Sequence, residues 1–212
     1  MNDSFHIGAV ILAAGCSSRM GETKQLLQLG NGLTLLAQVL DRVRASRVEE
    51  IVLVLGHEAA RVRCQIDTSE LNVVVNERYR EGMSTSLSLG LASLRHNPAA
   101  AFVVLADQPF IQPATLDQLI DRYEQTRARI IVPIHNGTRG NPVLLDRSIF
   151  PEVMALTGDV GARAIFGRHT HEILRVAVDD SGVLVDIDNR EDWKKFQSAE
   201  RPQHDRSHDN DS

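Results

Sequence analysis

The sequence predicts an α/β fold in which a mostly parallel sheet is covered by helices on both faces. Short, β-branched apolar runs alternate along the chain with longer segments whose apolar residues recur at helical spacing. Because strand–helix–strand connections are right-handed crossovers, this alternation makes neighbouring strands parallel and places helices on both faces. Ligands of such sheets bind beyond the carboxyl ends of the strands, so residues just past a strand are the first candidates for function.

In the first half of the chain, strands and helices are expected to alternate. Buried strands are predicted at the short apolar runs 8–14, 50–56, 72–75 and 101–106. Helices are predicted from their apolar spacing at residues 33–43, 58–66 and 84–95. Thr34 is the candidate N-cap of the first helix. The first apolar run is too short to span a membrane and lacks the layout of a signal peptide, so we expect no membrane partner.

The second half continues the pattern with shorter elements. Pro113 opens a helix over 113–126, because proline is favoured in the first helical turn. Strands are expected at 130–133, 142–145, 172–178 and 182–187, and helices at 147–156, from loop 157–163 to Phe166, and at 189–197. Trp193 and Phe196 should face inward from the last helix. Residues 1–197 are interpreted as a single domain, and the polar residues 198–212 as a disordered tail.

The composition excludes several classes of protein. The chain has 212 residues, 42% hydrophobic and 24% charged, with a net charge of −5. This is an ordinary globular balance, and the lack of a basic excess argues against a general nucleic-acid-binding protein. The two cysteines, Cys16 and Cys64, show neither the spacing of a zinc site nor a disulfide framework. We therefore expect a protein of a reducing compartment, the cytoplasm by default.

The loop after the first predicted strand, residues 13–24 (AAGCSSRMGETK), has the chemistry to hold a polyphosphate. Glycines let the backbone turn its amides toward a ligand, serine hydroxyls donate hydrogen bonds, and arginine and lysine bind phosphate oxygens. The groups that offer this chemistry are Gly15, Ser17, Arg19, Gly21 and Lys24. The alternative is an ordinary turn with solvated charges, but such turns are usually only about 2–6 residues long.

Two common phosphate-binding motifs do not fit this loop. A Walker loop needs glycine five residues after Gly15, where Met20 stands, and the dinucleotide fingerprint needs glycine two residues after it, where Ser17 stands. By motif the loop is therefore neither a P-loop nor a nicotinamide-binding turn. This disfavours a nicotinamide-linked reductase.

Carboxylates at two places are candidate ligands for Mg²⁺. Asp107 directly follows the run 101–106, and Mg²⁺ usually takes few protein carboxylates together with phosphates and water. Asp107 lies too far upstream of Pro113 to cap the next helix. Asp186 and Asp188 alternate, so on a strand they would share one face, and either could complete the metal shell. Asp188 could instead cap the last helix.

Residues 12–24, LAAGCSSRMGETK, resemble the signature L-A-A-G-x-S-x-R-M-G-x-x-K of the MobA-like nucleotidyltransferases. Further segments resemble, in order, those of the molybdenum cofactor cytidylyltransferase branch of that family. They are residues 76–91 (NERYREGMSTSLSLGL), 105–109 (LADQP), 137–145 (GTRGNPVLL), 158–163 (GDVGAR) and 185–193 (VDIDNREDW). The resemblance runs from about residue 7 to residue 196, nearly the whole chain. Two positions depart from the family's pattern. Asn141 stands where many relatives have histidine, and Asn189–Arg190 stands where they usually have Thr-Pro.

The resemblance implies a Rossmann-like three-layer α/β sandwich of the nucleotide-diphospho-sugar transferase type, dependent on Mg²⁺. The implied reaction joins CMP, from CTP, to the phosphate of molybdopterin and releases pyrophosphate. In this family the glycine-rich loop holds the triphosphate, the residue matching Lys24 approaches the α-phosphate, and the residue matching Asp107 binds the metal. The twin alanines Ala13 and Ala14 favour cytosine, since the guanylyl branch more often has L-A-G-G there.

On this basis we expect Lys24 and Arg19 to stabilise the α-phosphate while Asp107 holds Mg²⁺. The base would be read by the backbone of residues 13–15 together with Gly82 and Ser86. Arg139, Asn141 and Arg163 are candidates for the acceptor site, with the two arginines on its phosphate. The alternative is that they belong to plain surface loops, and that nearby Asp159 only caps the short helix after it.

Two alternatives to this function stay open at the level of sequence. The first is a MobA-like enzyme that uses GTP or a different phosphorylated acceptor. The second is a non-catalytic accessory protein that binds molybdenum cofactor and hands it to a client molybdoenzyme. A pure carrier has no need for the full set Gly15, Arg19, Lys24 and Asp107, which argues against the second.

Overall fold

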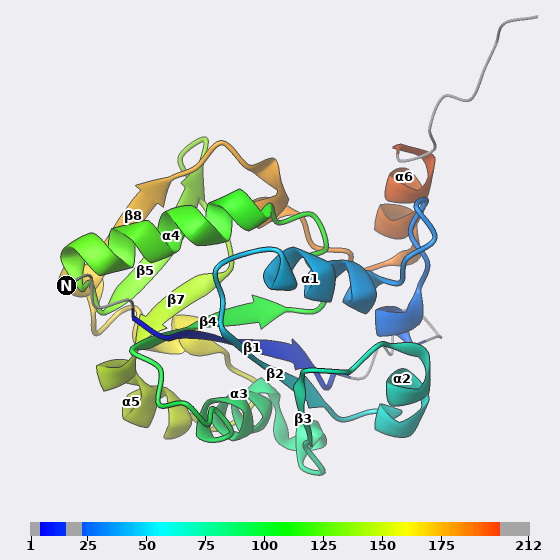
Figure 1. The fold of residues 1–212 in the computed structure, drawn as a ribbon, viewed down its shortest axis with the longest axis horizontal. Helices are drawn as coiled ribbons and strands as arrows, with labels where there is room; N and C mark the ends of the chain where they lie inside the picture. Colours follow the sequence, from blue (N-terminus) through cyan, green and yellow to red (C-terminus); the bar gives the residue numbers. More distant parts are fainter. Residues whose placement is uncertain (1–4, 16–22, 200–212) are drawn as a thin grey trace, which may run out of the picture.

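The computed structural model describes residues 5–15 and 23–199, and within them an eight-stranded sheet carries helices on both faces (Figure 1). The strands are β1 Ile7–Ala13, β2 Glu50–Leu55, β3 Asn72–Val75, β4 Ala100–Leu105, β5 Ile130–His135, β6 Thr138–Arg139, β7 Val143–Asp146 and β8 Ile173–Ala177. The α-helices are α1 Leu35–Arg44, α2 Ala59–Gln65, α3 Met83–Ala92, α4 Pro113–Thr126, α5 Phe150–Met154 and α6 Arg190–Ala199. The strands lie in the order β3-β2-β1-β4-β7-β5-β6, and β8 pairs with β5.

The sheet is mostly parallel, as predicted. β1 pairs in parallel with β2 and β4, β2 with β3, and β5 with β8. β7 is antiparallel to both of its neighbours, β4 and β5. Only residues 136–142 connect β5 to β7, whereas a parallel connection needs a crossover of a dozen or more residues. The short connection instead forms a hairpin through β6.

The central strands are buried on both faces, which explains their continuous apolar sequences. Successive side chains of β1 point to opposite faces: Ile11 packs in the layer with α1 and α4, and Val10 in the layer with α3 and α5 (Figure 1). Gly90 lets α3 lie close to the sheet, because a Cβ at this position would be 2.2 Å from Val10 Cγ1. This close approach fixes the distance between α3 and the sheet, and the first turn of α3 contributes to the candidate site.

The predicted helices are present with shifted ends. Thr34 caps α1, since its hydroxyl oxygen accepts from the Ala37 amide at 3.2 Å. The helix predicted over 147–156 begins as a 3₁₀ turn, η3 (Arg147–Ile149), and α5 ends at Met154. The short helix before Phe166 is also a 3₁₀ turn, η4 (Ala162–Ile165).

The strand predicted at 182–187 is wrong. The chain forms the 3₁₀ turn η6 (Ser181–Leu184) and then runs in irregular backbone to α6. The cause is the buried carboxylate of Asp180. It accepts from the Gly182 amide at 2.9 Å, the Gln112 amide at 2.9 Å and the Thr115 hydroxyl at 2.7 Å. These bonds bend the backbone into a turn. The premise that Asp186 and Asp188 share one face of a strand therefore fails.

The last helix is capped by Asn189, not by Asp188. The side-chain oxygen of Asn189 accepts from the amides of Glu191 at 2.8 Å and Asp192 at 2.9 Å, as an N-cap does. As predicted, Trp193 and Phe196 pack inward, against a small apolar cluster around Ile187. This packing anchors α6 beside the end of the sheet.

The carboxyl-terminal end of the domain follows the prediction only in part. α6 continues to Ala199, so residues 198 and 199, assigned to the tail, are helical. The rest of the predicted tail lies outside the described residues, and the extent of the single domain stays a prediction. None of the helices in the described ranges is long and apolar enough to cross a membrane.

The close packing of α3 makes a testable prediction. Gly90→Ala should destabilise the fold by about 1–3 kcal/mol, because the new methyl group overlaps Val10. For a chain of this size that lowers the Tm by roughly 2–10 °C in a thermal melt. Gly167→Ala is the matched control, since no atom lies within 4 Å of its added Cβ. Equal melting of the two variants would contradict the packing described here.

Candidate active site

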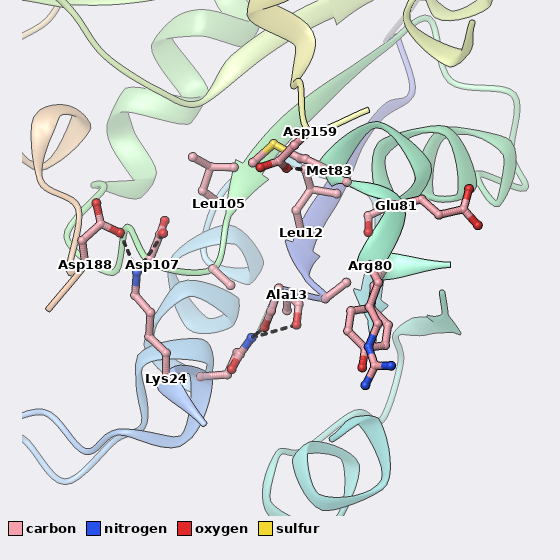
Figure 2. Close-up of a pocket in the computed structure, with 17 residues that line it drawn as sticks. Leu12, Ala13, Lys24, Arg80, Glu81, Met83, Leu105, Asp107, Asp159 and Asp188 are labelled. Atoms are coloured by element: carbon pink, nitrogen blue, oxygen red, sulfur yellow. Dashed lines mark hydrogen bonds and ion pairs between the residues drawn. The ribbon is translucent and has the colours of Figure 1, made fainter. Parts of the chain in front are cut away.

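A cavity of about 690 Å³ opens at the carboxyl ends of β1 and β4 (Figure 2). This is the edge at which the sequence places ligands. Eight of the residues predicted for nucleotide or metal binding line it: Ala13, Ala14, Gly15, Lys24, Gly82, Ser86, Asp107 and Asp188. Ser17, Arg19 and Gly21, also predicted to bind nucleotide, lie outside the described residues.

Lys24 lies between two carboxylates that come from distant parts of the chain. Its Nζ is 3.0 Å from Asp107 Oδ2 and 2.9 Å from Asp188 Oδ1 (Figure 2). The Lys24 side chain is only 14% exposed, so its charge-assisted bond to Asp107 is largely shielded from bulk water, whereas the Asp188 side chain is 57% exposed. Ile187 reinforces the arrangement, because its amide donates to the Asp107 carbonyl at 3.0 Å. The contacts bring the end of β4 and the segment before α6 to one wall of the cavity.

One carboxylate oxygen of Asp107 has no hydrogen-bond partner within the part of the chain that the structure describes. Oδ1 is buried and accepts no hydrogen bond from any described residue, although Oδ2 is paired with Lys24. A buried polar atom without a partner is costly, and carboxylate oxygens are the ligands that Mg²⁺ prefers. The pair Asp107 and Asp188 therefore fits a divalent cation.

Asp186 is placed differently from the other two carboxylates. It does not line the cavity, and Gln108 Nε2 donates to its Oδ1. Loss of hydration around the carboxylate raises the pKa of Asp186, and the charges of Asp107 and Asp188 raise it further, against the lowering effect of the Gln108 bond. Asp186 thus adds negative charge behind the site without facing the cavity.

Gln25, which the sequence interpretation missed, fixes the floor of the cavity. It lies in the 3₁₀ turn η1 (Lys24–Leu26), is buried, and donates from Nε2 to the carbonyls of Ala13 at 2.9 Å and Gly15 at 3.3 Å. This clamp holds the backbone just past β1. In the sequence, only the position of Gln25 next to Lys24 hints at this role, because the residues that it bonds to are ten or more positions away.

The opposite wall is the start of α3 packed against the loop at residue 158. Gly82 has φ +116°, and a Cβ there would be 2.3 Å from the Gly158 carbonyl carbon, so only glycine fits without displacing the loop. Ser84 Oγ donates to the Gly158 carbonyl at 2.7 Å, and Asp159 Oδ1 accepts from the Met83 amide at 3.1 Å. Asp159 therefore caps α3, not the short helix that follows it.

Three more residues line the cavity that the sequence interpretation did not assign: Tyr79, Arg80 and Glu81 of the 3₁₀ turn η2 (Tyr79–Glu81). Arg80 and Glu81 lie across the cavity from Lys24 (Figure 2). Arg80 also lies over the Tyr79 ring, 5.6 Å from its centroid. Their segment, NERYREGMS, was part of the resemblance, but no spacing marks these side chains individually.

The predicted acceptor residues lie outside the cavity lining. Arg139 of β6 lies 5.0 Å from the centre of the Phe166 ring. Burial lowers the pKa of Arg139, and the charges of Arg163 and of Arg175 on β8 lower it further. Arg175 was not among the residues predicted for the acceptor site. None of the three arginines forms an ion pair with a carboxylate of the described residues. The third predicted residue, Asn141, donates from its backbone N–H to the Val183 carbonyl at 3.0 Å.

Residues 9–173 match the family of MobA-like NTP transferase domains. The chain is 26% identical over 193 residues to the nicotine blue oxidoreductase of Paenarthrobacter nicotinovorans, covering 87% of this chain and 93% of that protein. It is 23% identical over 188 residues to the molybdenum cofactor cytidylyltransferase of Escherichia coli strain K12, covering 88% and 93%.

Solved structures share the fold over most of their length. Rv0371c from Mycobacterium tuberculosis H37Rv superposes with a TM-score of 0.83 at 32% identity, covering 92% of this chain and 98% of that one. A structure of the same protein in complex with manganese has a TM-score of 0.79 at 30% identity, covering 92% and 99%.

The raised pKa of Asp186 predicts a pH-dependent effect on stability. A carboxyl group whose pKa is higher in the folded state stabilises the fold below its unfolded pKa, near 3.8, and loses that stabilisation as pH rises through the folded pKa. Asp186→Asn, which keeps the Gln108 bond, should therefore raise the Tm by about 1–2 °C at pH 7 without metal ions. The gain should disappear below about pH 4. A Tm gain that is the same at both pH values would contradict the assignment.

Proposed function

The chain belongs to the MobA-like NTP transferase family and is a nucleotidyltransferase. We propose that it transfers CMP from CTP to a molybdopterin-type acceptor. Pyrophosphate would be the other product. The observation that carries the proposal is the convergence of Lys24, Asp107 and Asp188 beside the backbone of residues 13–15, at the ligand edge of the sheet. The cytidylyltransferase relative, matched over 93% of its length, supports the choice of reaction.

Transfer at phosphorus depends on position and charge more than on covalent help from the protein. Lys24, at the cavity wall, would stabilise negative charge at the α-phosphate, together with Arg19 from the preceding loop. Asp107 and Asp188 would hold Mg²⁺, with Asp186 as a more distant third carboxylate, and the bound ion would supply positive charge to balance that of the pyrophosphate. The acceptor phosphate is already a nucleophile, so no general base is needed.

The nucleotide base would be read at the floor and far wall of the cavity. The backbone of Ala13, Ala14 and Gly15 is held by the Gln25 clamp and can offer fixed hydrogen bonds. Gly82 permits a close approach, and Ser86 is oriented by the Asn76 amide, which donates to its hydroxyl at 2.9 Å. Ser17 and Gly21 would contribute from the loop to the phosphates.

Arg139 and Arg163 would bind the phosphate of the acceptor, with Arg175 as a third cation and Asn141 beside them. Guanidinium groups that cluster with no ion-pair partner among the described carboxylates suit a bidentate anion. The loop from Asp159 to Arg163 leads from the cavity to this cluster, which supports a continuous path between the two substrates. A client molybdoenzyme that takes up the product is a further proposed partner.

A second candidate is an oxidoreductase, because one relative of similar identity carries that name. The loop after β1 lacks the dinucleotide fingerprint, and a reductase has no evident use for Lys24 clamped by two carboxylates. A separate spectrophotometric assay should therefore show no oxidation of NADH or NADPH by this protein.

The reaction is tested by measuring pyrophosphate release with CTP, GTP, ATP and UTP in the presence of Mg²⁺, with and without molybdopterin. We expect release with CTP that depends on the acceptor. A preference for GTP would favour a guanylyltransferase, and the absence of release with every nucleotide would favour the accessory-protein alternative.

The charge cluster is tested in the same assay. Lys24→Ala and Asp107→Ala should each lower kcat by about 10²–10³, as for loss of one electrostatic group at a transition state. The controls are Lys195→Ala and Asp179→Ala, which remove the same charges from exposed positions. Wild-type rates in both cluster variants would refute their assignment.

The acceptor site makes a separate prediction. Arg163→Gln and Arg175→Gln should each raise the KM for molybdopterin about tenfold or more, by loss of a charge-assisted hydrogen bond, while the KM for CTP stays unchanged. Arg168→Gln is the matched control, because this arginine is exposed and paired with Glu152 at 2.8 Å. A rise in the KM for CTP alone would place these arginines at the nucleotide instead.

A further inference from the structure

Two histidines and a glutamate converge at the other edge of the sheet, at the amino ends of the strands. His6 precedes β1, Glu50 begins β2, and His96 lies between α3 and β4. β1 lies between β2 and β4, so the three residues meet where these neighbouring strands begin. This edge, near the N label in Figure 1, is roughly 20–25 Å from the cavity, given seven residues in β1.

The spacing of the three side chains is that of ligands around one ion. Glu50 Oε2 is 3.6 Å from His6 Nε2 and 3.5 Å from His96 Nδ1. Both separations are too long for good hydrogen bonds. Two ligands at about 2.0–2.1 Å from a tetrahedral Zn²⁺ are about 3.3–3.4 Å apart, close to these values. All three ligand atoms lie within 4.8 Å of one another.

His6 presents the correct nitrogen to this point. Its Nδ1 is 3.1 Å from Glu49 Oε2, which favours the proton on Nδ1 and leaves the lone pair on Nε2. Nε2 is buried and has no hydrogen-bond partner among the described residues. A histidine that donates its other ring N–H to a carboxylate is the usual arrangement in metal sites.

Glu50 is held in place by backbone amides, not by the imidazole rings. Its side chain is only 6% exposed, and it accepts from the Arg95 amide at 2.7 Å and the His96 amide at 3.2 Å. These bonds fix the carboxylate and leave a lone pair of Oε2 directed toward the two imidazoles. A buried, oriented anion facing two histidines is a rigid set of donors.

We propose that His6, Glu50 and His96 form a binding site for a transition-metal ion of the Zn²⁺ type, separate from the nucleotide cavity. Two imidazoles and one carboxylate suit Zn²⁺ and its neighbours, whereas Mg²⁺ and Ca²⁺ prefer oxygen ligands alone. Water would complete the tetrahedron. The bound ion would cross-link the starts of three strands and so stabilise the fold.

Zinc binding to the full chain, measured by equilibrium dialysis in excess Mg²⁺, tests the proposal. We expect one tightly bound Zn²⁺ per chain. His96→Gln and His6→Gln should each weaken that binding by more than about tenfold, since even loss of an outer partner of a metal ligand costs 10–100-fold. His96 is 69% exposed in its side chain, so His96→Gln should fold normally even if His6→Gln does not.

Matched controls distinguish this site from others. His171→Gln removes another exposed histidine, His204→Gln/His208→Gln removes two from the carboxyl-terminal sequence, and Asp107→Asn disables the proposed catalytic metal site. All should bind Zn²⁺ as the wild type does. Unchanged affinity in His96→Gln, or loss of binding in a control alone, would overturn the proposal.

Thermal melting gives a second readout. With Zn²⁺ at about 100 times its Kd, the Tm of the wild type should rise by roughly 5–10 °C, and that of His96→Gln should not. The metal-free Tm of the two proteins should be equal. An equal rise of the Tm in both proteins would also overturn the proposal.

Discussion

The Lys24 ammonium held between Asp107 and Asp188 is the contact on which the rest of the candidate site depends. It brings together a 3₁₀ turn after β1, the end of β4 and the segment before α6, which are far apart in sequence. Without this cation, Asp107, Asp188 and nearby Asp186 would repel one another across a small volume. The Gln25 clamp and the Ile187 backbone bond keep the surrounding backbone fixed, so the charges are positioned before a ligand arrives.

The sheet explains why this contact can form and why the molecule has two distinct edges. Parallel strands buried on both faces put all of their carboxyl ends on one side, where Gly15 and Asp107 meet. Their amino ends lie on the other side, where His6, Glu50 and His96 converge. The inserted antiparallel β7 joins β4 to β5, and the two other strands that pair with β5, β6 and β8, carry Arg139 and Arg175.

The parts that the sequence predicts are those set by local chemistry. The apolar runs of β1, β2 and β4 and the Thr34 cap follow from short-range rules. What it missed depends on partners distant in the chain. Asp180 bends residues 181–184 through bonds to α4 and its N-terminal flank, which turned a predicted strand into a 3₁₀ turn. Gln25 and Arg175 gain their roles only from residues that folding brings beside them.

The most direct measurement is a crystal structure of the chain with CTP and Mn²⁺, using the anomalous signal of the metal to locate it. We expect an anomalous peak between the carboxylates of Asp107 and Asp188, with the triphosphate beside Lys24 and the cytosine toward Gly82. A peak elsewhere, or a nucleotide bound away from the ends of β1 and β4, would contradict the assignment of this cavity as the active site.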